Sequence, residues 1–324
     1  MKAAHLAMLL AWLIVASAPT HALDRRVDIF DTHAAGGLPS QFNLPTPAND
    51  GTQAIRLIGE LRAHLDTGSG LGRMFLAEID GRPGTIVRLG DTLDIALAED
   101  DKDPPSASAG APIDREYRRA GMPPLASRGK GATRKAAYTP ALDVWIFLHE
   151  TAGENDHAKF LNWYVGWWIN DLEENVKLEV PIRVSLRDNV PGLTDMDYDA
   201  GTDVERIGEV ARRGAEHLQA YGVATTPLTK YVLFVDRPPS NWASGTLGSA
   251  VPPYGAAIVS NRGHRHIFAH EVGHLLDATH ELAERQFFCI TNMMDNLIGA
   301  FSCKYYSEAN NERIRRYVHD RSGR

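Results

Sequence analysis

From about residue 140 onward, short apolar runs alternate with longer amphipathic stretches. Apolar runs of about four to eight residues between turn signals are typical of buried strands, and longer stretches with a period of about 3.6 residues are typical of helices. The alternation predicts an α/β (α+β) fold over 140–324, with long helices on a twisted mixed sheet. We expect strands at 142–148, 180–186, 231–235 and 257–260, an irregular edge strand within 238–256, and helices at 158–175 and 203–221.

The N-terminal part has a different pattern. Two apolar segments, 74–79 and 85–89, flank the turn signal Asp80-Gly81-Arg82-Pro83-Gly84, which is typical of a β-hairpin. Residues 23–98 are therefore expected to form a small β-rich unit. Residues 99–139 lose hydrophobic periodicity and carry proline pairs and paired basic residues, so we expect a flexible, protease-accessible linker there.

Residues 1–22 have the organisation of a secretory signal peptide. Lys2 precedes the apolar run Leu6 to Val15, and Thr20-His21-Ala22 ends in a small residue suited to cleavage. The mature protein is therefore expected to be secreted, into a periplasm or out of the cell. No later stretch approaches the ~20 apolar residues of a membrane span, so none is expected.

Composition and charge narrow the class of protein. The chain has 324 residues, of which 44% are hydrophobic, which is enough for a large buried core and excludes disorder throughout. The formal net charge is −7, and acidic and basic residues are mixed along the chain. This balance argues against nucleic acid or an anionic membrane surface as a partner. Nothing in the pattern indicates an oligomeric state.

The sequence contains two cysteines, Cys289 and Cys303. In an exported protein, an even pair close in sequence predicts one disulfide. Two buried free thiols are the alternative. A cysteine-ligated zinc site is disfavoured because neither residue belongs to a CxxC pair.

The segment His270 to His280 contains the candidate metal ligands and a candidate general base. On a helix, His270 and His274 stand one turn apart on the same face, so that both imidazoles can reach one metal ion. His280 can add a third nitrogen if the chain turns sharply after Leu276. Three protein ligands and one open position describe a catalytic zinc site, in which Glu271 would act as general base on a metal-bound water. The opposite face of the helix carries a stripe suited to a core, made of Phe268, Val272, Leu275 and Leu276.

The motif resembles that of the metzincin clan of zinc endopeptidases, HExxHxxGxxH followed by a methionine turn, which here is Asn292-Met293-Met294. The order of expected strands and helices is also similar, so that the resemblance covers roughly 140–324. Glu281 and the stretch Phe301-Ser302-Cys303 are similar to features of the reprolysin (adamalysin) group and its bacterial members. The hairpin at 74–89 resembles the propeptides of such enzymes.

The resemblance implies roles for further residues. Met294, or less favoured Met293, would form an apolar floor beneath the ligands. A protein or peptide substrate would lie extended against the edge region that begins at Gly245, adding main-chain hydrogen bonds as an extra strand. The wall of the pocket for the residue after the cut is expected to include Leu297, Ile298 and Phe301.

Two positions depart from the clan pattern. Asp277 replaces the glycine between the second and third histidines, where the clan uses a left-handed backbone conformation. Aspartate tolerates positive φ better than most residues, so we expect the turn to form at some conformational cost. Asn296 stands where astacins and serralysins carry a tyrosine, so a tyrosine fifth ligand is absent.

Two other constellations invite a metal interpretation. Residues 195–203 space carboxylates like a calcium loop, but an EF-hand requires glycine and glutamate where Ala200 and Arg206 stand. A solvated acidic loop is therefore favoured over Ca²⁺. His264 and His266 precede the motif, and we expect exposed or hydrogen-bonding side chains rather than ligands.

Together these patterns predict a secreted zymogen: signal peptide 1–22, β-rich prosegment 23–98, linker 99–139 and a metzincin-like zinc endopeptidase domain at 140–324. Two alternatives stay open. One is an exported binding module that keeps the fold without turnover, which the substitution at Asp277 would explain. The other is a zinc amidase acting on a non-protein amide.

Overall fold

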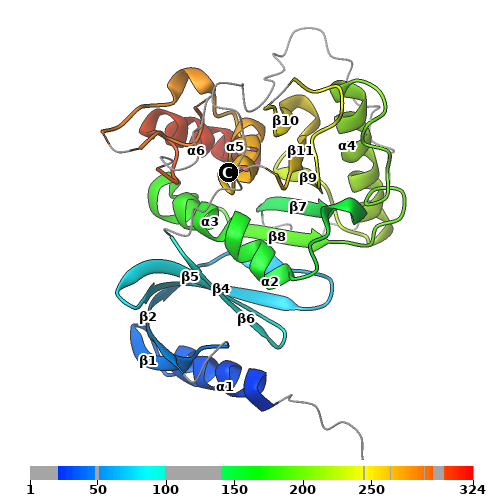
Figure 1. Ribbon diagram of the computed structural model, residues 1–324. Coiled ribbons are helices and arrows are strands. Elements are labelled where there is room, and N and C mark those ends of the chain that lie inside the picture. The colour runs from blue at the N-terminus through cyan, green and yellow to red at the C-terminus, as the bar shows by residue number, and fades with distance from the viewer. Residues whose placement is uncertain are drawn as a thin grey trace, which may run out of the picture.

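The computed structural model describes residues 21–47, 51–98, 140–243, 245–262, 264–287, 289–294 and 303–323. The predicted linker and almost all of the predicted signal peptide lie outside these residues. Figure 1 shows an N-terminal unit in blue and cyan below a larger part that holds the remaining helices and strands. The strands are β1 (Ser40–Pro45), β2 (Thr52–Glu60), β3 (His64–Asp66), β4 (Leu71–Ile79), β5 (Arg82–Leu89), β6 (Thr92–Leu97), β7 (Leu142–Leu148), β8 (Ile182–Arg187), β9 (Thr229–Val235), β10 (Gly248–Val251) and β11 (Ala256–Ser260). The main helices are α1 (His21–Ala35), α2 (His157–Phe160), α3 (Trp167–Asp171), α4 (Asp203–Ala220), α5 (His266–Leu275) and α6 (Glu308–Ser322).

One mixed sheet runs through the whole molecule. Its order is β1-β2-β4-β3-β8-β7-β9-β11-β10, and β5 and β6 continue from β4. From β8 to β11 the strands are parallel, whereas β10 is antiparallel to β11 at the end of the sheet. All seven residues of β9 are buried, as expected for a parallel strand covered on both faces. The predicted α/β fold with a mixed sheet is confirmed.

A long helical segment covers one face of the parallel strands. It runs through α2, a π-helical turn η2 (Leu161–Gly166), α3 and a second π-helical turn η3 (Leu172–Val176). The helix expected at 158–175 is therefore present, with two π turns that its sequence did not signal. The indole of Trp168 is fully buried and meets the ring of Phe268 on α5 edge to face at 5.3 Å.

Helix α4 covers the opposite face. The pattern Thr202-Asp203-Val204-Glu205 is typical of a capping box, and both of its reciprocal hydrogen bonds are present. Its inner face, including Ile207 and Val210, forms a second core with residues of β9 and β11. The parallel sheet is thus covered on both sides, and α5 lies beside β10 and β11.

The N-terminal unit is β-rich, as expected, but it begins with a helix that was not predicted. Helix α1 places Phe30 against Phe42 and Phe75 of the strands. The hairpin β4–β5 turns through Asp80 and Gly81 alone, both with positive φ (51° and 77°). The turn is shorter than the predicted segment 80–84, because two residues with positive φ suffice for a tight hairpin.

The N-terminal unit and the rest of the chain share strands and a core. Strand β3 pairs in parallel with β8, and Arg187 next to the pairing forms an ion pair with Asp66 at 2.7 Å. Apolar residues of 61–89 belong to the same core cluster as β7, β8 and the long helical segment, among them Leu65, Met74 and Val87. The expected boundary near residue 98 therefore does not separate two independent cores.

Cys289 and Cys303 form a disulfide, with a Cα–Cα distance of 4.9 Å, as predicted. Helix α6 follows shortly after it and was not predicted. Among the described residues no helix is long and apolar enough to cross a membrane.

Candidate metal centre

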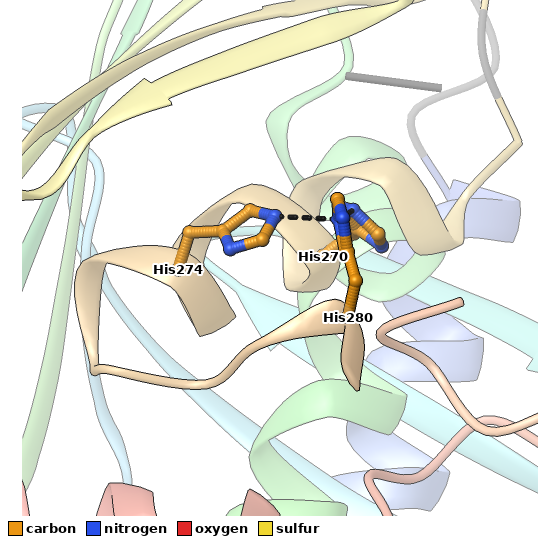
Figure 2. Close-up of side chains that lie close together, drawn as sticks. All are labelled: His270, His274 and His280. Atoms are coloured by element: carbon orange, nitrogen blue, oxygen red, sulfur yellow. Dashed lines mark hydrogen bonds between the residues drawn. The ribbon is translucent and has the colours of Figure 1, made fainter. Parts of the chain in front are cut away.

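Three histidine side chains converge at the C-terminal half of α5. His270 and His274 lie one helical turn apart, and His280 approaches from the 3₁₀ turn η5 (His280–Leu282) beyond the end of the helix (Figure 2). Nε2 of His280 lies 3.1 Å from Nε2 of His270 and 3.0 Å from Nε2 of His274. Among the described residues, these three histidines are the group of side chains that could hold a metal ion.

The other ring nitrogens determine the tautomers of the two helical histidines. Nδ1 of His270 lies 2.8 Å from the carbonyl oxygen of Asn292, and Nδ1 of His274 lies 3.2 Å from that of Ala278. A carbonyl oxygen only accepts a hydrogen bond, so each Nδ1 must carry the proton and donate it. In a neutral imidazole this leaves a lone pair on Nε2. Two lone pairs facing a third ring nitrogen at about 3 Å fit a cation bound between them. Three imidazole nitrogens with an open fourth position are the ligand set of catalytic zinc.

The turn that delivers His280 forms in the way expected from Asp277. This residue has φ 74°, in the left-handed region, directly after the C-terminal end of α5. The amide of Ala278 donates back to the carbonyl of Gly273 at 2.9 Å and closes the turn. An aspartate therefore occupies the conformation for which glycine is usual, and the third histidine still reaches the site.

The floor beneath the histidines is built around Gly273. A β-carbon at this position would lie 2.6 Å from Sδ of Met293 and 2.9 Å from Cε1 of Tyr306, so only glycine permits this packing. Met293 is fully buried, whereas Met294 is only partly buried against the core. The structure thus places Met293, rather than the favoured Met294, against the histidine helix. The two are adjacent in sequence, and the turn orients only the first inward.

Tyr306 links this floor to the long helical segment. Its hydroxyl donates to the carbonyl of Ala269 at 2.5 Å and accepts a hydrogen bond from the indole of Trp168 at 3.1 Å. Complete burial raises its pKa well above the usual value, so Tyr306 remains neutral. The apolar stripe predicted for α5, Phe268, Val272, Leu275 and Leu276, is fully buried.

Glu271 lies next to the first histidine and is fully buried beside β10. A β-carbon at Gly248, the first residue of β10, would lie 2.2 Å from Oε1 of Glu271. The absence of a side chain at Gly248 therefore leaves the space that the carboxylate occupies. This glycine was not singled out from the sequence, although glycine inside a strand often marks a close approach.

The expected substrate residues are only partly described. Gly245 lies just before β10, with φ 87°, and β10 is the terminal strand of the sheet. Leu297, Ile298 and Phe301 lie outside the described residues. The structure thus supports an edge strand next to the histidine helix.

The acidic loop uses its carboxylates within the protein. Asp199 pairs with Arg237 and accepts the amide of Ser240, and Asp203 forms a buried ion pair with Arg206 at 2.8 Å. These carboxylates are neutralised by arginines rather than gathered around a common point.

His266 differs from its expectation. It is 1% exposed and meets the ring of Trp167 edge to face at 4.8 Å. Burial lowers its pKa well below the usual value. It is therefore a neutral core residue and does not join the three-histidine cluster.

Comparisons with known proteins support the fold. No family model and no curated protein matches the sequence. The structure is similar to metalloproteinase-II from Bacteroides fragilis, with a TM-score of 0.53 and 14% sequence identity, over 86% of this chain and 91% of that chain. Residues 140–324 make up less than three fifths of the sequence, so the similarity extends into the N-terminal unit. At this identity the likeness is one of fold. The mixed α/β fold matches a metalloproteinase fold, and the histidine cluster fits a zinc site.

Proposed function

We propose that this chain is a secreted zinc-dependent endopeptidase of the metzincin type, similar to reprolysin-like bacterial enzymes and made as a zymogen. The observation that carries the proposal is the convergence of three histidines, in which Nε2 of His280 lies 3.1 Å from Nε2 of His270 and 3.0 Å from Nε2 of His274. The Nδ1 atoms of His270 and His274 donate to carbonyls, so that their Nε2 atoms carry lone pairs. Neutral imidazoles do not repel a cation. Three protein ligands would leave the fourth coordination position of a zinc ion open for water or a substrate oxygen.

The residues of the site would have different roles in peptide hydrolysis. A zinc ion held by His270, His274 and His280 would supply Lewis acidity, lowering the pKa of a water and polarising the scissile carbonyl. Glu271 would take a proton from the attacking water and pass it to the leaving amine. Gly248 holds open the space in which this carboxylate lies.

The edge strand β10 is the proposed binding surface for the peptide. A strand at the end of a sheet has main-chain groups on one side available for pairing with an extended chain. Because β10 lies against α5, a peptide added beside it would pass the histidines. Gly245, Leu297, Ile298 and Phe301 remain the proposed substrate contacts.

Secretion and latency are parts of the same proposal. Export depends on the signal peptide proposed at 1–22, and activation on cleavage within 99–139. The N-terminal unit shares a sheet and a core with the rest of the chain, which supports a role for it in latency.

The decisive experiment compares three proteins after cleavage of the linker: the unaltered chain, Glu271→Gln, and Glu174→Gln as a control at an exposed glutamate on the long helical segment. We expect zinc in all three and cleavage of a denatured protein by the first and third. Cleavage that persists in Glu271→Gln would refute the mechanism. Zinc without cleavage in any of the three would point to the binding module, and hydrolysis of small amides alone would point to the amidase.

A further inference from the structure

Helix α6 holds the segment that carries the third histidine. Three side chains at its N-terminal end, at the N-cap position 307 and at positions 310 and 313, are spaced by three residues and so share one face at the start of the helix. Each reaches across to the main chain between 277 and 282. We call Ser307, Asn310 and Arg313 the clasp.

Asn310 makes the central contact of the clasp. Its Oδ1 accepts the amide of Thr279 at 2.9 Å, and its Nδ2 donates to the carbonyl of Thr279 at 3.1 Å. The side chain is fully buried. Both main-chain groups of the residue before His280 are thereby satisfied by one side chain, as a strand neighbour would satisfy them.

The two flanking contacts close the ends of the segment. Ser307 caps α6 by accepting the amide of Asn310 and donates to the carbonyl of Leu282 at 2.5 Å. Arg313 donates from Nε to the carbonyl of Asp277 at 2.7 Å, and its Nη2 lies 2.8 Å from Oδ2 of the same residue. His280 thus lies inside a loop whose two ends are bonded to one helix.

The contact with Asp277 compensates for the departure from glycine. A non-glycine residue in the left-handed region costs about 1–2 kcal/mol, a cost that glycine does not carry. Arg313 contacts both the carbonyl and the carboxylate of Asp277. A glycine at this position would keep the carbonyl but would have no carboxylate. The ion pair is about one-third exposed, with 33% and 37% of the two side chains accessible. Solvent screening weakens its Coulomb energy, so its main effect is to fix the geometry of the turn.

We propose that Asp277 and Arg313 are a positioning pair that fixes the third zinc ligand, so that the metal affinity of the site depends on helix α6. The inference rests on the proposed zinc function. Outer-shell partners that orient metal ligands typically contribute about 10- to 100-fold to metal affinity. Neither residue belongs to the three-histidine cluster, so each would act through the position of His280.

The test is a zinc titration of the full-length chain after removal of metal, in competition with a chromophoric chelator. We compare Arg313→Ala, Asp277→Gly, the double variant, and Arg316→Ala, which removes an exposed arginine from the same helix. Arg313→Ala is expected to raise the zinc Kd by about 10-fold or more. Asp277→Gly and Arg316→Ala are expected to bind zinc within a few-fold of the unaltered chain. In the double variant the loss caused by Arg313→Ala is expected to shrink, because glycine needs no carboxylate anchor.

A second readout separates positioning from general stability. Co²⁺ reports its coordination geometry in its visible spectrum, so Arg313→Ala should alter that spectrum, whereas Arg316→Ala should leave it unchanged. If Arg313→Ala does not fold, Asp277→Asn serves in its place, because it keeps the side-chain shape and the tolerance of positive φ while removing the charge.

Equal zinc affinity and equal Co²⁺ spectra for Arg313→Ala and Arg316→Ala would overturn the proposal, as would an undiminished Arg313→Ala effect in the Asp277→Gly background. A chain that binds zinc tightly and, after cleavage of the linker, hydrolyses no protein would defeat the peptidase function while leaving the zinc comparison valid. A chain that binds no zinc would defeat both.

Discussion

The carboxylate of Glu271 and the backbone of Gly248 are in direct contact, such that a β-carbon on Gly248 would lie 2.2 Å from Oε1. The two residues come from α5 and β10, and Leu275 of α5 and Ala250 of β10 belong to one buried cluster. The position of the proposed general base therefore depends on a missing side chain in the neighbouring strand.

Gly248→Ala is expected to lower kcat by about 100-fold while zinc stays bound. The added methyl must push Glu271 away from its place, and a displacement of about 1 Å of a catalytic group can cost about 100-fold. Steady-state kinetics on a quenched peptide and metal analysis measure the two effects. Gly59→Ala is the matched control, because a β-carbon there meets nothing within 4 Å. Normal turnover by Gly248→Ala would show that Glu271 needs no such space.

Removal of zinc is expected to destabilise the protein. Nε2 of His280 lies about 3 Å from Nε2 of both His270 and His274, an arrangement that favours the state in which a cation is bound. A ligand at 100 times its Kd adds about 2.7 kcal/mol to the free energy of unfolding. A strong chelator should therefore lower Tm, and added Zn²⁺ should restore it. His280→Ala should lose most of this response, and a chelator effect of equal size in that variant would exclude His280 as a ligand.

Asp171 is expected to make the free energy of unfolding depend on pH. It is buried beside Tyr306 and Asn175, and burial raises its pKa to about 7 from an ordinary 3.8. The folded chain thus binds this proton more tightly than the unfolded chain does, so the contribution to stability is complete below about pH 4 and is lost as pH rises towards 7. At 1.36 kcal/mol per pKa unit, the loss is about 4 kcal/mol at most.

Asp171→Asn should remove that slope. Chemical denaturation at pH 4 and pH 8 should show the variant gaining stability relative to the unaltered chain at the higher pH. Asp320→Asn, at an exposed position on α6, is the control and should follow the unaltered chain. An identical pH profile for Asp171→Asn would mean that Asp171 is already charged at neutral pH.

Hydrogen bonds from Asn162 are expected to help keep the N-terminal unit bound to the rest of the protein after the linker is cut. Its amide donates to the carbonyls of Thr85 and Asp94 and to the Asp94 carboxylate at 2.7 Å, all across the contact between the two parts. Asn162→Ala leaves these buried groups without that donor, at a cost of about 1–3 kcal/mol. Gel filtration of the nicked protein on dilution should show 23–98 dissociating about 5- to 150-fold more readily, and Asn155→Ala, at an exposed position, should not change it. Equal retention in both variants would place the attachment elsewhere, in the β3–β8 pairing.

The sequence indicated the parallel strands, the histidine helix, the three histidines and the disulfide, because each rests on local periodicity or spacing. Helix α6 escaped notice because its sequence is mostly polar, with Ile314 and Val318 fully buried within it. Its function lies in polar contacts to a distant turn, which no local pattern signals.

Other features depended on tertiary packing. Strand β3 has three residues, too few for a recognisable pattern, yet it joins the two parts of the molecule. The choice between Met293 and Met294 depends on which side chain the turn directs towards Gly273, and adjacent identical residues carry no information about that.

The pairing of β3 with β8 has a consequence for the proposed activation by cleavage. While residues 23–98 stay attached, the main-chain groups of β8 are hydrogen-bonded on both sides, to β3 and to β7. Loss of that unit would uncover an unprotected strand edge beside apolar residues of the core, a template for aggregation between molecules. A protein activated in this way would therefore aggregate least at low concentration, or with its cleaved N-terminal unit still bound along the edge of β8.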